Sequence, residues 1–470
     1  MKKINLLLIA GIFLIGTTAR SQQVPVILDA MLSQALDSMH TQLGNKSLSA
    51  AVQLSNSAVW TDAIGISSVQ PPVAVTPTYV YGLGSVAKTM TAACILQLLD
   101  SAFIELDDSL YQYLDTFTHI SPNVTIAQLL RHQSGLYDVF ANTNLQPTLL
   151  GDPDSVWNSE DIITTFIKAP TGLPGGPWKY CNTNYILLGM IIESVTGNPY
   201  HVELKNRFFN YLGLASIGTS SHDTLAGPIA HAWIDLNGDQ ITDDAHWFFF
   251  PWLSLNSAAG AAGGYYGNAE DVTKWMRAYQ RGELHSAGTL AQAQATINAP
   301  GLPCTYGLGL MNYDFTGIFG YGHGGDLGYS ASSWYFPLYD ISITVLNNDA
   351  DFISWDLIPV VEALLLKYTE YINTVSIYES QTNTTAINVF PNPFNQTLTL
   401  ATMFSQAADE LRIDLYNASG QQMQTKTFSN ITSGQNIFEM EEAIRLAAGF
   451  YTMHIYVDGQ KVRVQKLVKQ

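Results

Sequence analysis

The sequence predicts an α+β domain followed by a small β-sandwich. Apolar residues recur with helical spacing from Val26 to Leu43, and they alternate as in a strand pair from Ser47 to Ser67. From Val389 to Gln470, short alternating runs are separated by turn residues, as is typical of a β-sandwich. At 470 residues, of which 47% are hydrophobic, the chain is long enough for more than one core. We therefore expect domains at 22–372 and 389–470.

The remaining elements follow from periodicity and from turn residues. A linker is expected at 373–388, because Gln, Thr, Asn and Ser dominate there and no apolar period survives. The expected helices are 90–99, 107–114, 125–131, 185–195, 269–280 and 355–368, and the expected later strands are 330–336 and 341–346.

Residues 1–21 have the pattern of a cleavable secretory signal peptide. Two lysines precede the apolar run Leu6 to Ile15, and small residues, Ala19 and Ser21, stand before Gln22. No later stretch reaches about 18 uninterrupted apolar residues, so no transmembrane span is expected. The formal net charge of −18 disfavours nucleic acid as a partner. An exported protein is the simplest interpretation.

The sequence predicts no metal site and no cofactor. Cys94, Cys181 and Cys304 are odd in number and widely spaced, which fits neither a disulfide framework nor a zinc site. Residues 235–244 carry oxygen ligands at alternate positions, as calcium loops do, but lack Gly at the sixth place and Glu at the twelfth. A hairpin turning at Asn237-Gly238 explains most of this pattern, and calcium remains the alternative.

Candidate chemistry begins at Gly84-Ser85-Val86-Ala87-Lys88-Thr89. Ser85 and Lys88 are three positions apart, so on a helix both side chains share one face and the amino group can reach the hydroxyl. The positive end of the helix dipole would favour an oxyanion near Ser85, and burial would favour a neutral, proton-accepting Lys88. A chain of this length contains on the order of one Ser-x-x-Lys by chance, so the motif alone is weak.

A nucleophilic serine also needs a proton relay, a substrate clamp and a second oxyanion donor. Tyr180 and Asn182, two residues apart in an expected loop, can point the same way, so that the phenol relays a proton and the amide holds a substrate carbonyl. The two glycines after His323 allow the backbone to approach a substrate closely. His132 lies in another loop, where a structural role is the more common one for a histidine.

In this order, the three elements resemble the Ser-x-x-Lys, Tyr-x-Asn and His/Lys-x-Gly motifs of the class C β-lactamase and D-alanyl-D-alanine carboxypeptidase family. Segments 125–136, 260–275 and 321–330 also resemble segments of that family, and the likeness covers residues 25 to 370. It implies a β-lactamase/transpeptidase-like fold, in which an antiparallel sheet is flanked by helices and the site lies beside a mostly helical subdomain.

The resemblance implies a serine hydrolase that forms an acyl-enzyme on an ester, amide or lactam carbonyl. Ser85 would be the nucleophile, and Lys88 and Tyr180 would share the general-base and general-acid work as a coupled pair. The oxyanion would lie between the N–H of Ser85 and the N–H of residue 326. The implied substrate-binding residues are Asn182, His323, Gly325 and Asp326.

Two positions in the family's motifs bear on the substrate. Gly324 stands where penicillin-recognising members usually have Thr, so a hydroxyl that would bind a substrate carboxylate is missing. His323 in place of Lys is, within the family, typical of peptidases and esterases. We therefore expect an esterase or a D-amino-acid peptidase rather than a true β-lactamase, acting on a small molecule or a peptide. The alternative is a catalytically silent surface binding protein with the same fold.

The tail resembles the C-terminal sorting domain of the type IX secretion system of Bacteroidetes. The likeness rests on Val389 to Phe394, on Tyr416 with Gly420, and on Gly449-Phe450-Tyr451 before a basic end. It implies export through the periplasm, the type IX machinery as a partner, and a secreted or cell-surface location. An ordinary adhesive or carbohydrate-binding sandwich is the alternative.

Overall fold

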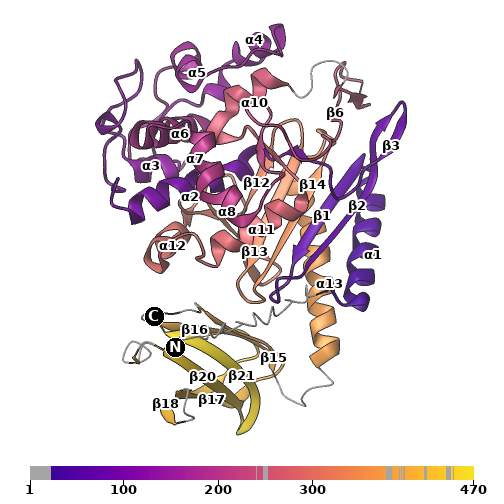
Figure 1. Ribbon diagram of the computed structural model, residues 1–470, viewed down its shortest axis with the longest axis vertical. Helices are drawn as coiled ribbons and strands as arrows, with labels where there is room; N and C mark the ends of the chain where they lie inside the picture. Colours follow the sequence, from indigo (N-terminus) through magenta and orange to yellow (C-terminus); the bar gives the residue numbers. More distant parts are fainter. Residues whose placement is uncertain are drawn as a thin grey trace, which may run out of the picture.

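The computed structural model describes residues 23–239, 241–246, 252–376, 384–390, 392, 394, 397–417, 421–440, 446–447 and 449–469. The expected signal peptide at 1–21 lies outside these residues. A large antiparallel sheet is covered by helices on both faces, a mostly helical region adjoins it, and a small β-sandwich follows (Figure 1). This arrangement is the fold that the sequence predicts.

The large sheet joins the two ends of its domain, because the N-terminal strand β1 pairs with β14, Ser49 lying opposite Leu346. All of its neighbouring strands are antiparallel. In spatial order the nine strands are β3 (Pro72–Ala74), β2 (Val59–Val69), β1 (Ser47–Gln53), β14 (Ile341–Asn347), β13 (Ser330–Phe336), β12 (Ile318–Asp326), β11 (Met311–Phe315), β10 (Thr305–Tyr306) and β9 (Ile297–Asn298).

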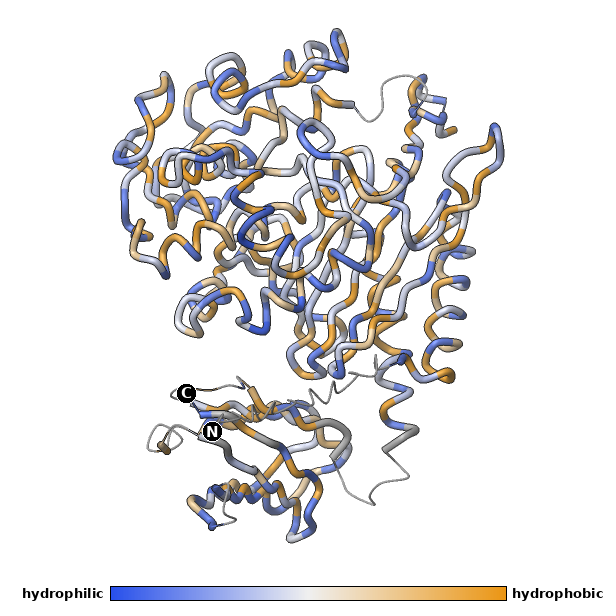
Figure 2. The backbone as a smooth tube through the Cα atoms, in the orientation of Figure 1, coloured by the Kyte–Doolittle hydropathy of each residue, from blue (hydrophilic) through white to orange (hydrophobic). Residues whose placement is uncertain are grey.

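Three helices cover this sheet. Helix α1 (Val26–Leu43) and α13 (Ile358–Ser376) pack against each other on one face, and α11 (Ala269–Gln280) packs on β1, β13 and β14 from the other (Figure 1). Strands β13 and β14 are therefore buried at every residue. Along α1, hydrophobic and hydrophilic residues alternate with helical spacing, and its apolar side faces the core (Figure 2). The predicted helices 26–43 and 269–280 are confirmed.

The helical region is built around α2, which is buried from Ala87 to Leu96 and packs against α6. Its elements are η1 (Gly84–Val86), α2 (Ala87–Asp100), η2 (Leu110–Gln112), α3 (Ile126–Leu130), η3 (Val139–Ala141), α4 (Leu145–Gly151), α5 (Ser159–Phe166), α6 (Asn182–Thr196), α7 (Tyr200–Leu204), η4 (Lys205–Phe209), α8 (Asn210–Leu212), α10 (Leu253–Ala259), η5 (Gly260–Ala262) and α12 (Ala287–Gln294). A further turn, η6 (Ser354–Leu357), precedes α13.

The predicted helix at 107–114 is wrong, since only the single turn η2 forms there. The N–H of Leu110 donates to the carbonyl of Val124 at 2.8 Å, and the N–H of Tyr111 donates to the carbonyl of Pro122 at 3.1 Å. A neighbouring loop thus takes donors that a longer helix would have used internally, and tertiary pairing overrides local periodicity.

Two small sheets complete this part of the chain. One holds β4 (Tyr81–Gly82), β8 (Tyr265–Gly267) and β5 (Gly218–Thr219), and the other holds β6 (Trp233–Ile234) and β7 (Asp243–Asp244). Strand β4 leads directly into the turn that carries Ser85.

The C-terminal strands form two sheets around one apolar core, as expected of a sandwich. One sheet contains β15 (Thr384–Phe390), β16 (Leu398–Phe404) and β19 (Gly434–Met440), and the other contains β18 (Gln422–Ile431), β17 (Ala408–Asn417), β20 (Gly449–Val457) and β21 (Gln460–Lys469). Helix α13 and strand β15 occupy both ends of the expected linker at 373–388, and 377–383 lie outside the described residues. No helix in the described ranges is long and apolar enough to cross a membrane.

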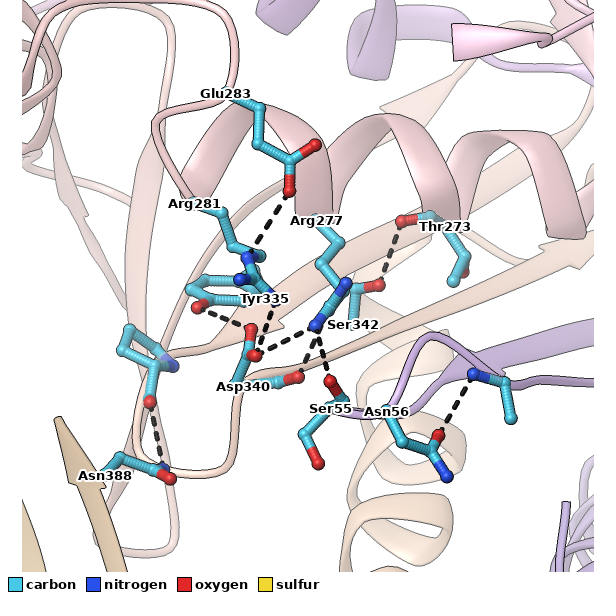
Figure 3. A network of polar contacts seen from close by, with 12 residues as sticks. Ser55, Asn56, Thr273, Arg277, Arg281, Glu283, Tyr335, Asp340, Ser342 and Asn388 are labelled. Carbon is cyan, nitrogen blue, oxygen red and sulfur yellow. Dashed lines mark hydrogen bonds and ion pairs between the residues drawn. The ribbon is translucent and has the colours of Figure 1, made fainter. Parts of the chain in front are cut away.

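A polar network centred on Asp340 ties two hairpin turns of the large sheet to α11 (Figure 3). The carboxylate accepts hydrogen bonds from Arg277 and Arg281, each at 2.8 Å. Arg277, whose side chain is only 5% exposed, also donates to the carbonyl of Ser55 at 3.1 Å. One buried guanidinium therefore joins two hairpin turns to one helix.

We expect Asp340→Asn to lower the free energy of unfolding by about 1–3 kcal/mol, because it removes the charged partner of the buried Arg277. Asn tolerates the left-handed backbone of residue 340, where φ is 51°, so the change does not add strain. Arg281→Gln is the matched control, since Arg281 is 32% exposed and its ion pair should contribute less than about 1 kcal/mol. Urea unfolding measures both values, and equal losses would contradict this assignment.

Candidate active site

Ser85 lies in the turn η1, directly before helix α2. Its position is set by β4 and by the N–H of Leu83, which donates to the carbonyl of Tyr265 at 2.8 Å. Gly84 has a φ of 49°, and a Cβ there would lie 2.6 Å from the backbone nitrogen of Asp326. Glycine is therefore required at this position, and it lets the serine turn lie against the end of β12.

The amino group of Lys88 lies beside the Ser85 hydroxyl and is fully buried. Its Nζ lies 2.8 Å from Ser85 Oγ, 2.8 Å from Asn182 Oδ1 and 2.6 Å from the carbonyl oxygen of Ala262. Burial lowers the pKa of Lys88 to about 7, while the nearby Asp138 opposes the change. Near neutral pH this lysine is thus divided between its charged and neutral forms.

Asn182 is held in one orientation by partners on both sides of its amide. Its Oδ1 faces Lys88, and its Nδ2 donates to Asp138 Oδ2 at 3.0 Å. The other oxygen of Asp138 accepts the N–H of Phe140 at 3.0 Å, so the carboxylate is itself fixed. The sequence predicted Asn182 as a substrate ligand, and the structure places its amide oxygen on Lys88.

Tyr180 lies over the same amino group, with Lys88 Nζ 5.0 Å from the centre of its ring. Burial raises the pKa of the Tyr180 phenol, and a hydrogen bond with Ser85 opposes that rise. The phenol therefore stays protonated near neutral pH. Ser85, Lys88 and Tyr180 form one hydrogen-bonded group, as their predicted shared role requires.

His323 and His132 are joined through the hydroxyl of Tyr306. The N–H of Cys181 donates to His132 Nδ1 at 3.1 Å, so the ring proton of a neutral His132 lies on Nε2, which is 3.2 Å from the Tyr306 oxygen. The Tyr306 hydroxyl, which also has a hydrogen bond with Tyr185, can then donate to His323 Nε2 at 3.0 Å, and His323 Nδ1–H donates to the carbonyl of Gly324. With these protonation states, every hydrogen bond in this buried series has one donor and one acceptor.

Both histidines are neutral in this arrangement. Burial lowers the pKa of His323 to about 3, and the nearby Lys88 adds to the effect. Burial also lowers the pKa of His132 well below its usual value. His323 therefore brings no positive charge to the site.

The end of β12 forms the other wall. A Cβ on Gly325 would lie 2.7 Å from the Ser85 nitrogen, so only glycine allows this contact. The carboxylate of Asp326 accepts hydrogen bonds from the N–H and the hydroxyl of Ser354, at 2.6 and 2.8 Å. Gly324 faces Ser354 as well, since a Cβ there would lie 2.5 Å from the Ser354 oxygen.

A cavity of about 370 Å³ opens over Ser85. Most of the predicted site residues line it, while Lys88 lies beneath it and Gly325 contributes backbone packing. The lining residues are Gly84, Ser85, Phe140, Tyr180, Asn182, Ala259, Ala262, Gly263, Leu302, Met311, His323, Gly324, Asp326, Leu327, Ser354 and Trp355.

Sequence reasoning missed four contributors to this site: Asp138, Ala262, Tyr306 and Ser354. No motif marks Tyr306 or Ser354, and the carbonyl of Ala262 acts through the backbone. Two signals were available: Asp138 lies two residues beyond the segment 125–136, and Ala262 lies within the segment 260–275.

The structure offers little support for the calcium alternative at 235–244. Asp235 Oδ1 accepts the N–H groups of Asn237 and Gly238, at 3.2 and 2.7 Å, as in a tight turn. The described part of the chain contains no group of three or more His, Cys, Asp or Glu residues placed to hold a metal ion. Cys94, Cys181 and Cys304 are all buried free thiols.

Two family models match the chain. A model described as beta-lactamase matches residues 29–354, and one described as a secretion system C-terminal sorting domain matches residues 388–470.

Curated relatives agree with the first match. Penicillin-binding protein 4 of Amycolatopsis lactamdurans is 29% identical over 277 residues, covering 54% of this chain and 68% of that protein. A D-aminopeptidase of Brucella anthropi is 27% identical over 293 residues, covering 61% of this chain and 52% of that protein. The chain thus spans about half the length of the D-aminopeptidase that it matches.

Solved structures share the fold. A D-stereospecific amidohydrolase from Streptomyces sp. superposes with a TM-score of 0.61 at 27% identity, covering 71% of this chain and 98% of that one. The D-amino acid amidase from Ochrobactrum anthropi SV3, bound to L-phenylalanine amide, superposes with a TM-score of 0.64 at 21% identity, covering 73% and 99%. At that identity the second likeness establishes the fold alone.

Proposed function

The chain belongs to the beta-lactamase family, and from this premise we propose that it is a serine hydrolase that cleaves ester or amide bonds through an acyl-enzyme on Ser85. The observation that carries this proposal is the buried amino group of Lys88, 2.8 Å from Ser85 Oγ and with a pKa lowered to about 7. A neutral amine at this distance can take the hydroxyl proton as Ser85 attacks.

Tyr180 would complete the proton path. Its protonated phenol shares a hydrogen bond with Ser85 and lies over Lys88. In the proposed reaction the proton taken from Ser85 passes through the Lys88–Tyr180 pair to the leaving group, and a water molecule later releases the acyl group by the reverse path. The N–H groups of Ser85 and Asp326, on backbones in close contact, would hold the oxyanion.

We further propose that the acyl donor is an ester or amide without a carboxylate next to the scissile bond, with D-amino-acid amides and peptides as the leading candidates. The neutral His323 and the absence of a side chain at Gly324 leave a substrate carboxylate without a partner on this wall. The names of relatives, D-aminopeptidase and D-stereospecific amidohydrolase, favour amides with a D-centre. β-Lactam turnover is the less favoured activity.

A fluorophosphonate probe should label the wild type at Ser85 and fail to label Ser85→Ala, because Ser85 lines the cavity and has the amino group of Lys88 in contact. Cys181→Ser is the matched control: its thiol lies next to Tyr180, and burial raises its pKa to about 12, so it is not the nucleophile. Mass spectrometry of the labelled peptide gives the site. Labelling that survives in Ser85→Ala, or an unlabelled wild type, would leave a silent binding protein as the better interpretation.

Residues 388–470 match the model described as a secretion system C-terminal sorting domain. We propose that the type IX machinery recognises this sandwich after the chain has reached the periplasm, and delivers the enzyme to the cell surface or the medium. The sandwich has an apolar core of its own, although Phe390 and Met403 also pack against the core of the large domain.

Deletion of residues 384–470, which removes β15 to β21, should leave ester hydrolysis within about threefold of the full-length value, because the cavity residues lie between 84 and 355. The truncated protein should accumulate in the periplasm. Cell fractionation with an activity assay measures both effects, and normal surface delivery of the truncated chain would contradict the sorting role.

A further inference from the structure

The cavity over Ser85 carries one ionisable charge on its wall. Among its lining residues, all within the described part of the chain, Asp326 is the single carboxylic acid and none is Lys or Arg. Lys88 lies beneath the floor with its amino group surrounded by Ser85, Asn182 and Ala262. A ligand in the cavity therefore meets a negative wall.

Hydrogen bonds from Ser354 hold the carboxylate of Asp326 in place on that wall. Its two oxygens accept the N–H and the hydroxyl of Ser354, at 2.6 and 2.8 Å, and Ser354 itself is only 5% exposed. Asp326 as a residue is exposed and lines the cavity. Partial burial of its carboxyl raises the pKa of Asp326, and the hydrogen bonds from Ser354 oppose that rise by stabilising the charged form. A carboxylate offers about four lone-pair directions, and the Ser330 side chain also hydrogen-bonds this group, so at least one direction remains for a ligand.

Gly324 and Ser354 belong to the same arrangement. Because a Cβ on residue 324 would lie 2.5 Å from Ser354 Oγ and 2.8 Å from Ser354 Cβ, a side chain there would displace the residue that anchors Asp326. Glycine at position 324 thus leaves space for Ser354, which holds the carboxylate of Asp326. We therefore expect that Gly324→Thr alone would not restore a carboxylate-binding hydroxyl at this position.

Distance and charge both favour a ligand group of opposite sign. The backbone nitrogen of Asp326 lies against the Ser85 turn, so the carboxylate is about one side chain away from the carbonyl that Ser85 would attack. An uncompensated anion so close to a developing oxyanion would raise the barrier to acylation. A cationic group on the substrate would remove that penalty.

We propose that Asp326 binds the ammonium group of the substrate, so that the enzyme selects acyl donors with a protonated amine next to the scissile carbonyl, and that Ser354 positions the carboxylate for this contact. The inference rests on the proposed hydrolase function, and it assigns the substrate's amine to one residue.

The test compares two substrates with the same leaving group, D-phenylalanine p-nitroanilide and its des-amino analogue 3-phenylpropionyl p-nitroanilide. At pH 7 the wild type should prefer the amine in kcat/KM by about tenfold or more. Asp326→Asn, which keeps the size and the backbone, should lower this ratio at least tenfold. Ser354→Ala should lower it by a smaller factor, mainly through the KM of the amine substrate.

Asp356→Asn is the matched control, because Asp356 also acts electrostatically on Asp326 but bonds the N–H of Ile353 instead of lining the cavity. Its substrate ratio should stay at the wild-type value. The wild-type preference should also fall as pH rises past the pKa of the α-amino group, about 7.7–8.0, since the ammonium is then lost.

Protection of Ser85 from a fluorophosphonate provides a readout that does not require amide turnover. 2-Phenylethylamine should slow labelling of the wild type and have at least tenfold weaker effect on Asp326→Asn, whereas 2-phenylethanol should not distinguish the two. Labelling without amine protection, or an Asp326→Asn variant that loses both substrates equally, would overturn the inference while the hydrolase function stands. Absence of labelling at Ser85 would overturn the hydrolase function, and the inference with it.

Discussion

The amino group of Lys88 lies in the protein interior with three oxygen atoms around it. The site depends on which of these oxygens accept its N–H groups. Asn182 Oδ1 and the carbonyl of Ala262 can only accept hydrogen bonds. A neutral amine has two N–H groups, which these acceptors occupy, so its lone pair is left facing Ser85 Oγ at 2.8 Å. Burial lowers the pKa of Lys88 to about 7, which keeps this form populated at neutral pH.

Each neighbour of Lys88 lies on a different element, and the packing of these elements brings the neighbours together. Ser85 precedes α2, Asn182 begins α6, and Ala262 ends η5. These three elements pack against one another, and Asp138 fixes the amide that faces the lysine. On the opposite wall, His323 is neutral and Asp326 contributes a carboxylate. We therefore expect this wall to favour a substrate amine over a substrate carboxylate.

Motif spacing predicted the contact between Ser85 and Lys88, because the two residues are three positions apart where the chain turns into α2. Long helices such as 26–43 and 269–280 were also predictable, since their apolar faces repeat over several turns. Contacts between distant segments were not. The pairing of Leu110 with Val124 removes an expected helix, and Ser354 reaches Asp326 from 28 residues away. No local pattern encodes such pairs.

The account is tested most directly by the rate at which a fluorophosphonate labels Ser85 as a function of pH. If a neutral Lys88 is the base, the rate should rise with pH, pass its midpoint near 7 and level off above that value. A rate that keeps rising toward the ordinary lysine pKa of about 10.4 would show that the buried amine is charged at neutral pH and does not activate Ser85.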